Sequence, residues 1–319
     1  MFNKLVIHLS KIRKNVLAVK SVTNKKIISV VKANAYGHNA IRVANSLLDI
    51  VDMFAVANMR EAKLLATNGI KKDILVLSKT TEYDTSFSNI IYMVDDKNYI
   101  PNHARVHIAV NSGMNRYGVD SRKEFLTLCK KLKRNKNSIE GVFSHFYSVN
   151  KENCNRQINR FKNIVGDIDL PVHFSSSHSL DIDLPQTYVR LGICQYYASK
   201  EIHTQVVDLH SVKKGEHIGY GQMRAKDDCV VAVLPIGYAD GLDLRLGNNW
   251  QVTINGRDYQ IVGKICMDCC FAVVDRKVKL GDKVIFFDGD ITKIARAVGS
   301  TEYEQMCRLY GDRYDIVFD

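Results

Sequence analysis

The sequence of 319 residues contains no long apolar run. One of its longest, VVAVLPI at residues 230–236, is far shorter than the roughly 20 residues of a membrane-spanning helix. The first ten residues, MFNKLVIHLS, lack the apolar stretch and the cleavage site of a secretory signal. With 46% hydrophobic and 25% charged residues, the composition is that of an ordinary globular protein and not of a disordered chain. We therefore expect a cytoplasmic protein that is large enough for two domains.

A disulfide framework is also missing. Eight cysteines in a chain of this length are too few for a disulfide scaffold, so we interpret them as reduced thiols. The group Cys266, Cys269 and Cys270 contains one C-x-x-C spacing, which is compatible with a zinc site. No second pair with comparable spacing follows, and the segment has the pattern of a strand. We therefore favour buried thiols over a metal site.

Negative charge is in deficit, because 34 Asp and Glu residues face 45 Lys and Arg residues, for a formal net charge of +11. Such a balance is compatible with a nucleic-acid partner, with an anionic substrate or cofactor, or with a lysine-rich surface. The densest basic run, KKLKRNKN at residues 130–137, has no interleaved aromatic residues and ends a predicted helix. We interpret it as a solvated helix end, and we expect neither a nucleic-acid nor a membrane partner.

Short β-rich runs alternate with polar or helical spacers between residues 25 and 193. Two of the spacers, at residues 58–69 and 121–133, have helical periodicity, and Ser121 is a candidate N-cap. Alternating strands and helices predict a parallel sheet, and eight strands suggest a closed (β/α)8 TIM-like barrel, although the spacers after Ser78 and Val94 are short. The eight runs are IISVV, MFAVA, ILVLS, IIYMV, VHIAV, EGVFSH, PVHFS and YVRLGI.

After about Lys200, strand-like runs follow one another without long helices. Asn255 and Gly256 lie between two such runs and predict a tight β-hairpin. Two short helices are expected near the end, at residues 290–299 and 300–310. The fold class that we predict is therefore α/β, with a barrel at residues 1–200 followed by a mostly β C-terminal domain at residues 201–319.

Lys32 ends the first predicted barrel strand. In such barrels the carboxyl ends of the strands carry the chemistry. A lysine at this place has its stem along the barrel wall and its amine at the mouth, where desolvation or cationic neighbours lower its pKa and make it a nucleophile toward a carbonyl. The alternative is an ordinary surface lysine.

Other polar groups follow the ends of later strands, namely Arg116, His145, residues 175–177 (SSS) and Arg190. Together with Lys32 they suit an anionic cofactor that carries an aldehyde, because hydroxyl groups bind phosphate and arginines bind ring heteroatoms and carboxylates. Taken singly, Arg190 could form a structural ion pair, His145 could be a core histidine, and the serines could form a polar turn.

Several motifs resemble the alanine racemase family, which are barrel enzymes that use pyridoxal 5'-phosphate (PLP). They occur in order along almost the whole chain, and the combination of GYADG with CMD in the second domain is the most specific. The resemblance implies a homodimeric isomerase that interconverts L- and D-alanine and supplies D-alanine for peptidoglycan. The matching segments are VVKANAYGHNA, SGMNRYGV, FSHFY, RLGI, IGYG, LPIGYADG, VGKICMD and EYEQMC.

The resemblance also implies roles for individual residues. Lys32 would bind PLP covalently and exchange a proton with the D-amino acid, and Tyr220 of a second subunit would do so with the L-amino acid. A phenol has a pKa near 10, so such a base needs positive charge nearby. The substrate would contact Arg116, Met267, Tyr238 and Asp268. The remaining cofactor-binding residues would be Tyr36, His145, Ser176, Ser177, Arg190, Gly192, Ile193 and Tyr303.

The chain departs from the family pattern at Ala109 and at Ser176. Ala109 stands where many members have a lysine that becomes carbamylated and orients the arginine matched by Arg116. Asn111 is our candidate for a replacement. Ser176 replaces an asparagine beside the phosphate-binding serine. This replacement implies weaker contacts at the phosphate end of the cofactor site.

Two other functions remain open from the sequence. The first is a racemase of serine or another small amino acid, with the same mechanism. The second is a non-catalytic PLP-binding barrel, a class that generally lacks a β domain and a counterpart of Tyr220.

Overall fold

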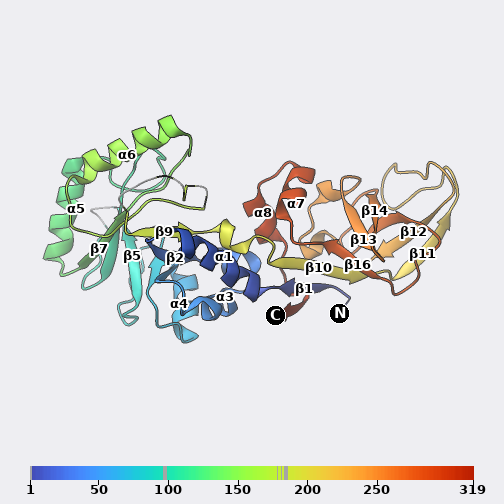
Figure 1. The fold of residues 1–319 in the computed structure, drawn as a ribbon, viewed down its shortest axis with the longest axis horizontal. Coiled ribbons are helices and arrows are strands. Elements are labelled where there is room, and N and C mark those ends of the chain that lie inside the picture. Colours follow the sequence, from blue (N-terminus) through green and yellow to red (C-terminus); the bar gives the residue numbers. More distant parts are fainter. Residues whose placement is uncertain (1, 96–98, 178, 181, 183–185) are drawn as a thin grey trace. The chain divides into compact units, whose positions relative to one another are not determined.

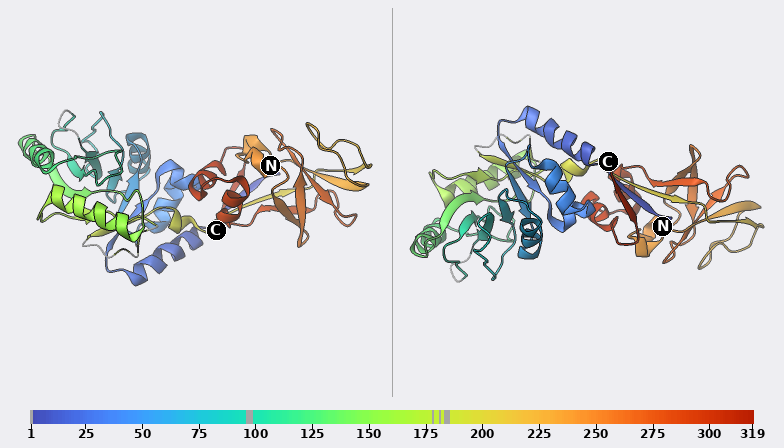
Figure 2. Two further views of the ribbon diagram at one scale, coloured as in Figure 1. Left: turned by 90° about the horizontal axis from the view of Figure 1, so that it is seen from above. Right: turned by 90° about the horizontal axis from the view of Figure 1, so that it is seen from below.

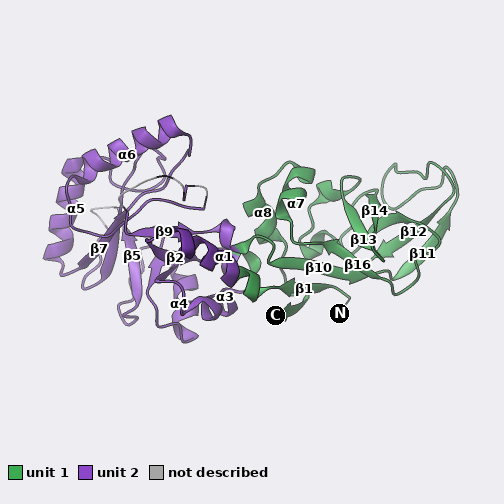
Figure 3. Cartoon of the chain, viewed as in Figure 1, with its two compact units in different colours: residues 1–12, 36–38, 196–319 green, residues 13–35, 39–195 purple. Residues whose placement is uncertain are grey.

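A computed structural model describes residues 2–95, 99–177, 179–180, 182 and 186–319. The chain divides into two compact units (Figure 3). One consists of residues 13–35 and 39–195, and we call it the barrel unit. The other consists of residues 1–12, 36–38 and 196–319, and we call it the sheet unit. Two short N-terminal segments therefore belong to the same unit as the C-terminal part of the chain.

The barrel unit is built around eight parallel strands that close on themselves. Each of the eight β-rich runs forms one of these strands, so the predicted barrel is confirmed. The apolar side chains of β3, β4 and β5 are buried throughout, as expected for parallel strands covered on both faces. In order around the barrel the strands are β2 (Lys26–Val30), β3 (Met53–Val56), β4 (Ile74–Val76), β5 (Ile90–Val94), β6 (Arg105–Ala109), β7 (Ser138–Phe143), β8 (Val172–His173) and β9 (Tyr188–Leu191).

Helices follow several of these strands, and α5 and α6 lie outside the strands in the views of Figure 2. Ser121 is the N-cap of α5, as predicted, because its side chain accepts a hydrogen bond from the backbone N–H of Glu124. In the described residues no helix separates β4 from β5, which agrees with the short spacer there. The helices of the first two-thirds of the chain are α1 (Leu9–Val22), α2 (Lys32–Gly37), α3 (Ala40–Leu47), α4 (Met59–Thr67), α5 (Arg122–Arg134) and α6 (Lys151–Val165).

The sheet unit contains a nine-stranded sheet (Figure 1). The hairpin at Asn255 and Gly256 is confirmed: both residues have positive φ, 50° and 76°, as a tight two-residue turn requires. The first and last strands of the chain are neighbours in this sheet, a pairing that the sequence did not indicate. The strand order is β11 (Asp208–Val212), β12 (Cys229–Leu234), β15 (Cys270–Val274), β14 (Arg257–Val262), β13 (Gln251–Ile254), β16 (Lys283–Phe287), β10 (Lys200–Gln205), β1 (Lys4–Ile7) and β17 (Asp315–Phe318).

Two short helices complete the sheet unit, α7 (Ile291–Val298) and α8 (Glu302–Arg308), close to the predicted bounds. Gly299 ends α7 in the left-handed conformation, with φ of 59°, as is common at helix C-termini. Single 3-10 turns are formed by η1 (Ile193–Tyr196), η2 (Tyr238–Asp240) and η3 (Leu244–Leu246). Among the described residues, no helix has the length and apolar character needed to cross a bilayer.

Candidate active site

Lys32 follows β2 and begins an unusual turn. The next five residues, from Ala33 to Gly37, all have positive φ, between 51° and 74°, so α2 is a left-handed helical turn. This conformation costs about 1–2 kcal/mol for each residue that carries a Cβ. Such strain is found at functional sites, where the surrounding structure maintains it. The side chain of Lys32 is half-buried at the start of this turn.

Glu61 of α4 supports the turn from the barrel side. One of its carboxylate oxygens accepts a hydrogen bond from the backbone N–H of Ala33 at 2.8 Å, and the other accepts from the N–H of Ala57 at 2.7 Å. The side chain of Asn34 accepts a hydrogen bond from the N–H of Ala40 at 2.8 Å, which connects the turn to α3. The bond to Ala33 satisfies a backbone donor within the left-handed turn, and the other two satisfy donors next to α4 and at the start of α3.

Arg190 of β9 is buried in the barrel, with 4% of its surface exposed. Its Nη2 donates to the carbonyl oxygens of Ser144 at 2.8 Å and Phe174 at 3.0 Å, and its Nη1 donates to the carbonyl of His173 at 3.1 Å. Within the described residues, no hydrogen bond uses Nε of Arg190. Burial, and then the charge of Arg116, lower the pKa of Arg190 to about 9, so the guanidinium stays protonated at neutral pH.

Two histidines contact this guanidinium, the buried His173 and the half-buried His145, and the buried His107 contacts His173. The Nδ1 atoms of His173 and His145 lie 2.5 and 3.1 Å from its nitrogens, and Nε2 of His173 lies 2.9 Å from Nδ1 of His107. Gly141 makes room for His107, because a Cβ there would be 2.7 Å from the imidazole. Burial lowers the pKa of His107 to about 3 and that of His173 well below its usual value.

The pKa of His145 is lowered by burial and by charged groups at the barrel mouth. Burial lowers its pKa to about 3, and the next causes are the charges of Arg190, Arg116 and Lys32. Neutral His145 is therefore within electrostatic reach of all three cations. The structure thus brings four of the sequence-predicted residues together at the carboxyl ends of the barrel strands.

Arg116 lies in the loop after β6 and is exposed. Its guanidinium lies 5.8 Å from the ring centre of Tyr117, and within the described part of the chain it forms no hydrogen bond or ion pair. Ala109 packs in an apolar cluster at this end of the barrel, with Met93 and Phe143. This cluster contains no charged side chain at the place where the resemblance implies a lysine.

Asn111 organises the loop that carries Arg116. Its Oδ1 accepts hydrogen bonds from the N–H groups of Gly113 and Asn115, both at 3.0 Å, and its Nδ2 donates to Asp120 at 2.7 Å. Gly118 packs against the backbone of Asn111, since a Cβ at Gly118 would be 2.4 Å from the Asn111 nitrogen. Asn111 therefore orders the backbone of the loop and forms no hydrogen bond to the guanidinium itself.

The serines after β8 lie next to the end of β9. The Oγ of Ser177 accepts hydrogen bonds from the N–H groups of Gly192 at 2.9 Å and Cys194 at 3.3 Å. The N–H of Ser176 donates to the Oγ of Ser179 at 2.7 Å. Ile193 begins η1 and is fully buried. This part of the barrel unit therefore concentrates hydroxyl groups and backbone N–H groups, which bind phosphate oxygens.

Two further residues with implied phosphate contacts belong to the sheet unit. Tyr36 and Tyr303 have ring centres 6.2 Å apart, and Tyr36 also lies 4.9 Å from the ring of Tyr196. Tyr36 is 5% exposed, whereas Tyr303, on α8, is 37% exposed. These two rings therefore meet within one unit, although 267 residues separate them in the sequence.

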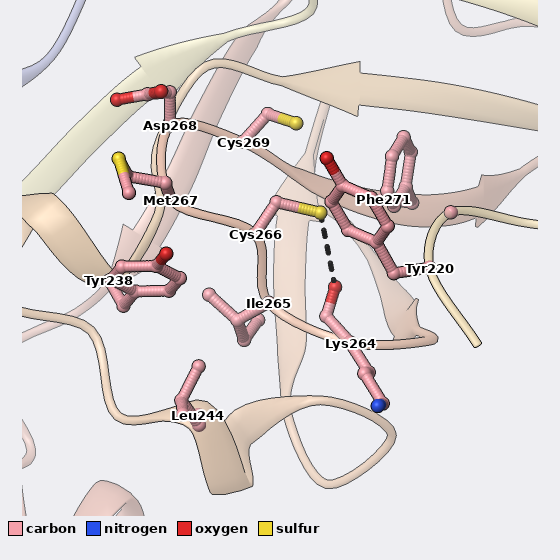
Figure 4. Close-up of a pocket in the computed structure, with 11 residues that line it drawn as sticks. Tyr220, Tyr238, Leu244, Lys264, Ile265, Cys266, Met267, Asp268, Cys269 and Phe271 are labelled. Atoms are coloured by element: carbon pink, nitrogen blue, oxygen red, sulfur yellow. Dashed lines mark hydrogen bonds between the residues drawn. The ribbon is translucent and has the colours of Figure 1, made fainter.

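Tyr220, Tyr238, Met267 and Asp268 line one pocket of the sheet unit, with a volume of about 870 Å³ (Figure 4). Tyr220 is 72% exposed and Met267 is 53% exposed. Lys264, Cys266 and Cys269 line the same pocket, and the Sγ of Cys266 lies 3.7 Å from the carbonyl oxygen of Lys264. Four of the five residues that the resemblance implies in the second domain, all except Tyr303, are thus neighbours.

The two motifs GYADG and CMD form one structure. The N–H of Tyr238 donates to the carbonyl of Cys266, and the N–H of Ala239 donates to that of Met267, both at 3.0 Å. Gly237 permits this close approach, because a Cβ there would be 2.3 Å from the carbonyl oxygen of Met267. Gly237 and the CMD segment therefore fix the backbone positions of Tyr238 and Met267, whose side chains line the pocket.

The cysteines of the CMD segment are free thiols, and Cys266 and Cys270 are buried. Burial, and then the neighbouring Cys266, raise the pKa of Cys269 to about 11. In the described ranges, no three His, Cys, Asp or Glu side chains are grouped as a metal site would require.

Sequence reasoning missed several supporting residues. Glu61, His107 and His173 contact other site residues or their backbone, but each lies within a predicted helix or strand and not at a strand end. The signal for the left-handed turn was present in the small residues after Lys32, since asparagine and glycine tolerate positive φ.

Comparisons with known proteins agree with this geometry. Residues 7–200 match the model of the alanine racemase N-terminal domain, and residues 200–318 match that of the C-terminal domain. The alanine racemase of Methanococcus maripaludis is 32% identical, with 95% of each chain covered. That of Fusobacterium nucleatum is 34% identical, covering 87% of this chain and 88% of its own.

A solved structure, the alanine racemase of Clostridium difficile 630, superimposes with a TM-score of 0.91 at 29% identity, covering all of this chain and 96% of its own. Both domain models and full-length relatives match, and the barrel-mouth residues and the pocket residues lie in the matched domains. The chain therefore belongs to the alanine racemase family.

Proposed function

We propose that this protein is a PLP-dependent racemase that interconverts L-alanine and D-alanine. The observation that carries the proposal is the group of Lys32, Arg116 and Arg190 around a neutral histidine at the barrel mouth. Three cations suit an anionic cofactor and a substrate carboxylate, and one of the cations is a primary amine.

The residues present fit PLP. Ser176 and Ser177 offer hydroxyl groups for a phosphate, Ile193 offers its backbone N–H, and Tyr36 and Tyr303 offer two phenols. His145 and Arg190 would lie beside the ring of the cofactor, and Lys32 would bind its aldehyde carbon. When bound, PLP supplies a conjugated system that takes up negative charge from the α-carbon of the substrate.

Arg190 is suited to contact the pyridine nitrogen. Its Nη atoms are occupied by carbonyl oxygens and imidazoles, while its Nε makes no hydrogen bond in the described chain. A guanidinium donates hydrogen bonds and does not give up its proton at neutral pH. A ring nitrogen opposite Nε would therefore accept a hydrogen bond and remain unprotonated, which weakens the electron sink and limits side reactions.

Lys32 and Tyr220 are the proposed acid–base pair. Racemisation removes a proton from one face of the α-carbon and returns one to the other, so two groups on opposite faces are needed. The Nζ of Lys32 would hold the proton exchanged with D-alanine, and the Oη of Tyr220 that exchanged with L-alanine. Arg116 would bind the substrate carboxylate, while Met267, Tyr238 and Asp268 would border its path.

A homodimer with composite active sites is part of this proposal. The pocket that contains Tyr220 has an exposed apolar border, because Tyr220, Tyr238, Leu244 and Met267 are between 40% and 72% exposed. Grouped exposed apolar side chains are typical of interaction surfaces. A second copy of the chain would cover them and receive Tyr220 in its own barrel mouth.

We also propose a cytoplasmic location, which the free state of all eight cysteines supports. D-alanine made there would enter peptidoglycan synthesis.

The proposed activity is tested by incubating the purified protein with PLP and L-alanine and measuring D-alanine by chiral chromatography. L-serine and L-lysine are assayed in parallel, and we expect alanine to react fastest. Borohydride reduction followed by mass spectrometry should locate the cofactor on Lys32. A PLP-loaded protein that forms no D-amino acid, or a label on another lysine, would contradict the proposal.

A further inference from the structure

Lys200, the first residue of β10, is a buried lysine that no role discussed so far explains. Only 1% of its surface is exposed. Its ammonium group donates hydrogen bonds to three carbonyl oxygens, those of Tyr36 at 3.1 Å and of Met306 and Leu309 at 2.9 Å. A lysine ammonium has three N–H donors, so all three are used.

This arrangement is costly for the fold. In the described part of the chain no carboxylate pairs with Lys200, and burial lowers its pKa to about 7. A buried charge without an opposite charge is tolerated where its hydrogen bonds are complete. An apolar side chain would fill the same place in the sheet unit at a lower free-energy cost. What only the lysine adds is the set of three hydrogen bonds to backbone carbonyls.

The three carbonyls come from two segments that are distant in sequence. Tyr36 lies in the left-handed turn that begins at Lys32, and Met306 and Leu309 lie at the C-terminal end of α8. The last carbonyls of a helix lack partners within the helix, and a cation there is favourable. Gly37 allows the approach, because a Cβ there would be 2.9 Å from the Nζ of Lys200.

Both joined segments carry a phenol with an implied phosphate contact. Tyr36 precedes Gly37 directly, and Tyr303 lies one turn before Met306 on α8, with the two rings 6.2 Å apart. The carbonyl of Tyr36 is held from a second side, since Nδ1 of His38 lies 3.1 Å from it. Lys200 therefore fixes the backbone on which both phenols are mounted.

We propose that Lys200 is a positioning residue for the phosphate group of the cofactor. It fastens the end of α8 to the turn at Tyr36 and so sets the spacing of the Tyr36 and Tyr303 hydroxyls. Lys200 contacts neither cofactor nor substrate. This inference rests on the proposed function, in which those two hydroxyls bind the phosphate.

The test compares Lys200→Met, which keeps the length of the side chain but removes the donors, with wild type. Lys283→Met, an exposed lysine in β16 of the same sheet, is the matched control. Apoprotein is titrated with PLP and, separately, with pyridoxal, which lacks the phosphate. We expect Lys200→Met to weaken PLP binding roughly tenfold, as removal of a supporting partner typically does. Pyridoxal binding should change little, and Lys283→Met should match wild type with both ligands.

Equal weakening of PLP and pyridoxal binding would show a general structural role and overturn the inference, as would unchanged PLP binding. If Lys200→Met fails to fold, Lys200→Gln, which keeps two N–H donors, is measured in the same way, and its ratio of PLP to pyridoxal affinity decides. Tyr303→Phe provides a second readout. Combined with the Lys200 variant, it should weaken PLP binding by less than the product of the two single effects, because both act on one contact. Effects that multiply would contradict action through Tyr303. A wild-type protein that does not prefer PLP over pyridoxal would instead contradict the proposed function.

Discussion

The barrel mouth and the Tyr220 pocket differ in how their side chains are held. At the barrel mouth, Arg190 is buried and contacts three carbonyls and two histidines, and Glu61 fixes the turn after Lys32. In the pocket of the sheet unit, Tyr220 is 72% exposed. The barrel side chains are therefore held by contacts within one chain, whereas the side chains of the Tyr220 pocket are largely exposed.

This difference implies that substitutions in the two regions should impair different properties of the protein. In the barrel they should disturb a network and affect cofactor binding and folding together. In the pocket they should affect the reaction and leave the stability of the isolated chain nearly unchanged.

The largest effect is expected from Lys32→Ala and Tyr220→Phe. Each removes one of the two proton-transfer groups, so we expect alanine racemisation to fall by roughly 10²–10⁴-fold or more. Lys32→Ala should also lose the absorbance of bound PLP, whereas Tyr220→Phe should keep it. Steady-state kinetics and visible spectra measure both. Full activity of Tyr220→Phe would exclude that residue as a base.

A large effect on stability is expected in acid. Burial keeps His107, His145 and His173 neutral in the folded chain, with pKa values of about 3 for the first two, below the ordinary value of 6.5. Between pH 6.5 and 3 the unfolded chain binds protons that the folded chain does not, so the free energy of unfolding should fall as pH falls through that window. Urea unfolding at pH 7 and pH 5 measures this. A stability that rises on acidification would contradict it.

A smaller effect is expected from Glu61→Ala. Loss of the carboxylate leaves the N–H groups of Ala33 and Ala57 without their acceptor and loosens the turn after Lys32. We expect kcat to fall about tenfold, because the support of a reacting group is removed. Glu152→Ala, at an exposed position of α6, is the control and should behave as wild type. Equal kinetics of the two variants would show that Glu61 does not position Lys32.

The smallest effect is expected from Asn111→Ala. The side chain orders the loop that carries Arg116, so its loss should raise the KM for alanine a few-fold, with kcat less affected. Asn45→Ala, on the exposed face of α3, provides the comparison. A larger effect on kcat than on KM would place Asn111 closer to the chemistry than its contacts indicate.

The fold was largely predictable from the sequence, because its signals are local. Eight β-rich runs formed eight strands, Ser121 capped its helix, and Asn255 with Gly256 made the hairpin. The pairing of β1 with β10 and β17 was not predictable, since it joins residues about 200 and 300 positions apart. Nothing in the run KLVI distinguishes that pairing from membership of the barrel.

The same distinction between local signals and distant contacts applies to the candidate site. Lys32, Arg116 and Arg190 could be singled out because charged residues at strand ends are unusual. Lys200 and Glu61 could not, because their importance lies in backbone carbonyls and N–H groups supplied by distant segments. A sequence shows which side chains can form hydrogen bonds but not which distant backbone groups they contact. The roles of the singled-out residues in binding and catalysis remain predictions.

The most direct test of a composite active site mixes two inactive variants. Lys32→Ala and Tyr220→Phe protein are purified separately, mixed in equal amounts, allowed to exchange subunits, and assayed for alanine racemisation. If each site takes its lysine from one chain and its tyrosine from the other, half of the dimers are mixed and each contains one intact site. Activity should then return to about a quarter of wild type. A mixture that stays as inactive as its two components, although subunit exchange is demonstrated, would mean that both groups act within a single chain.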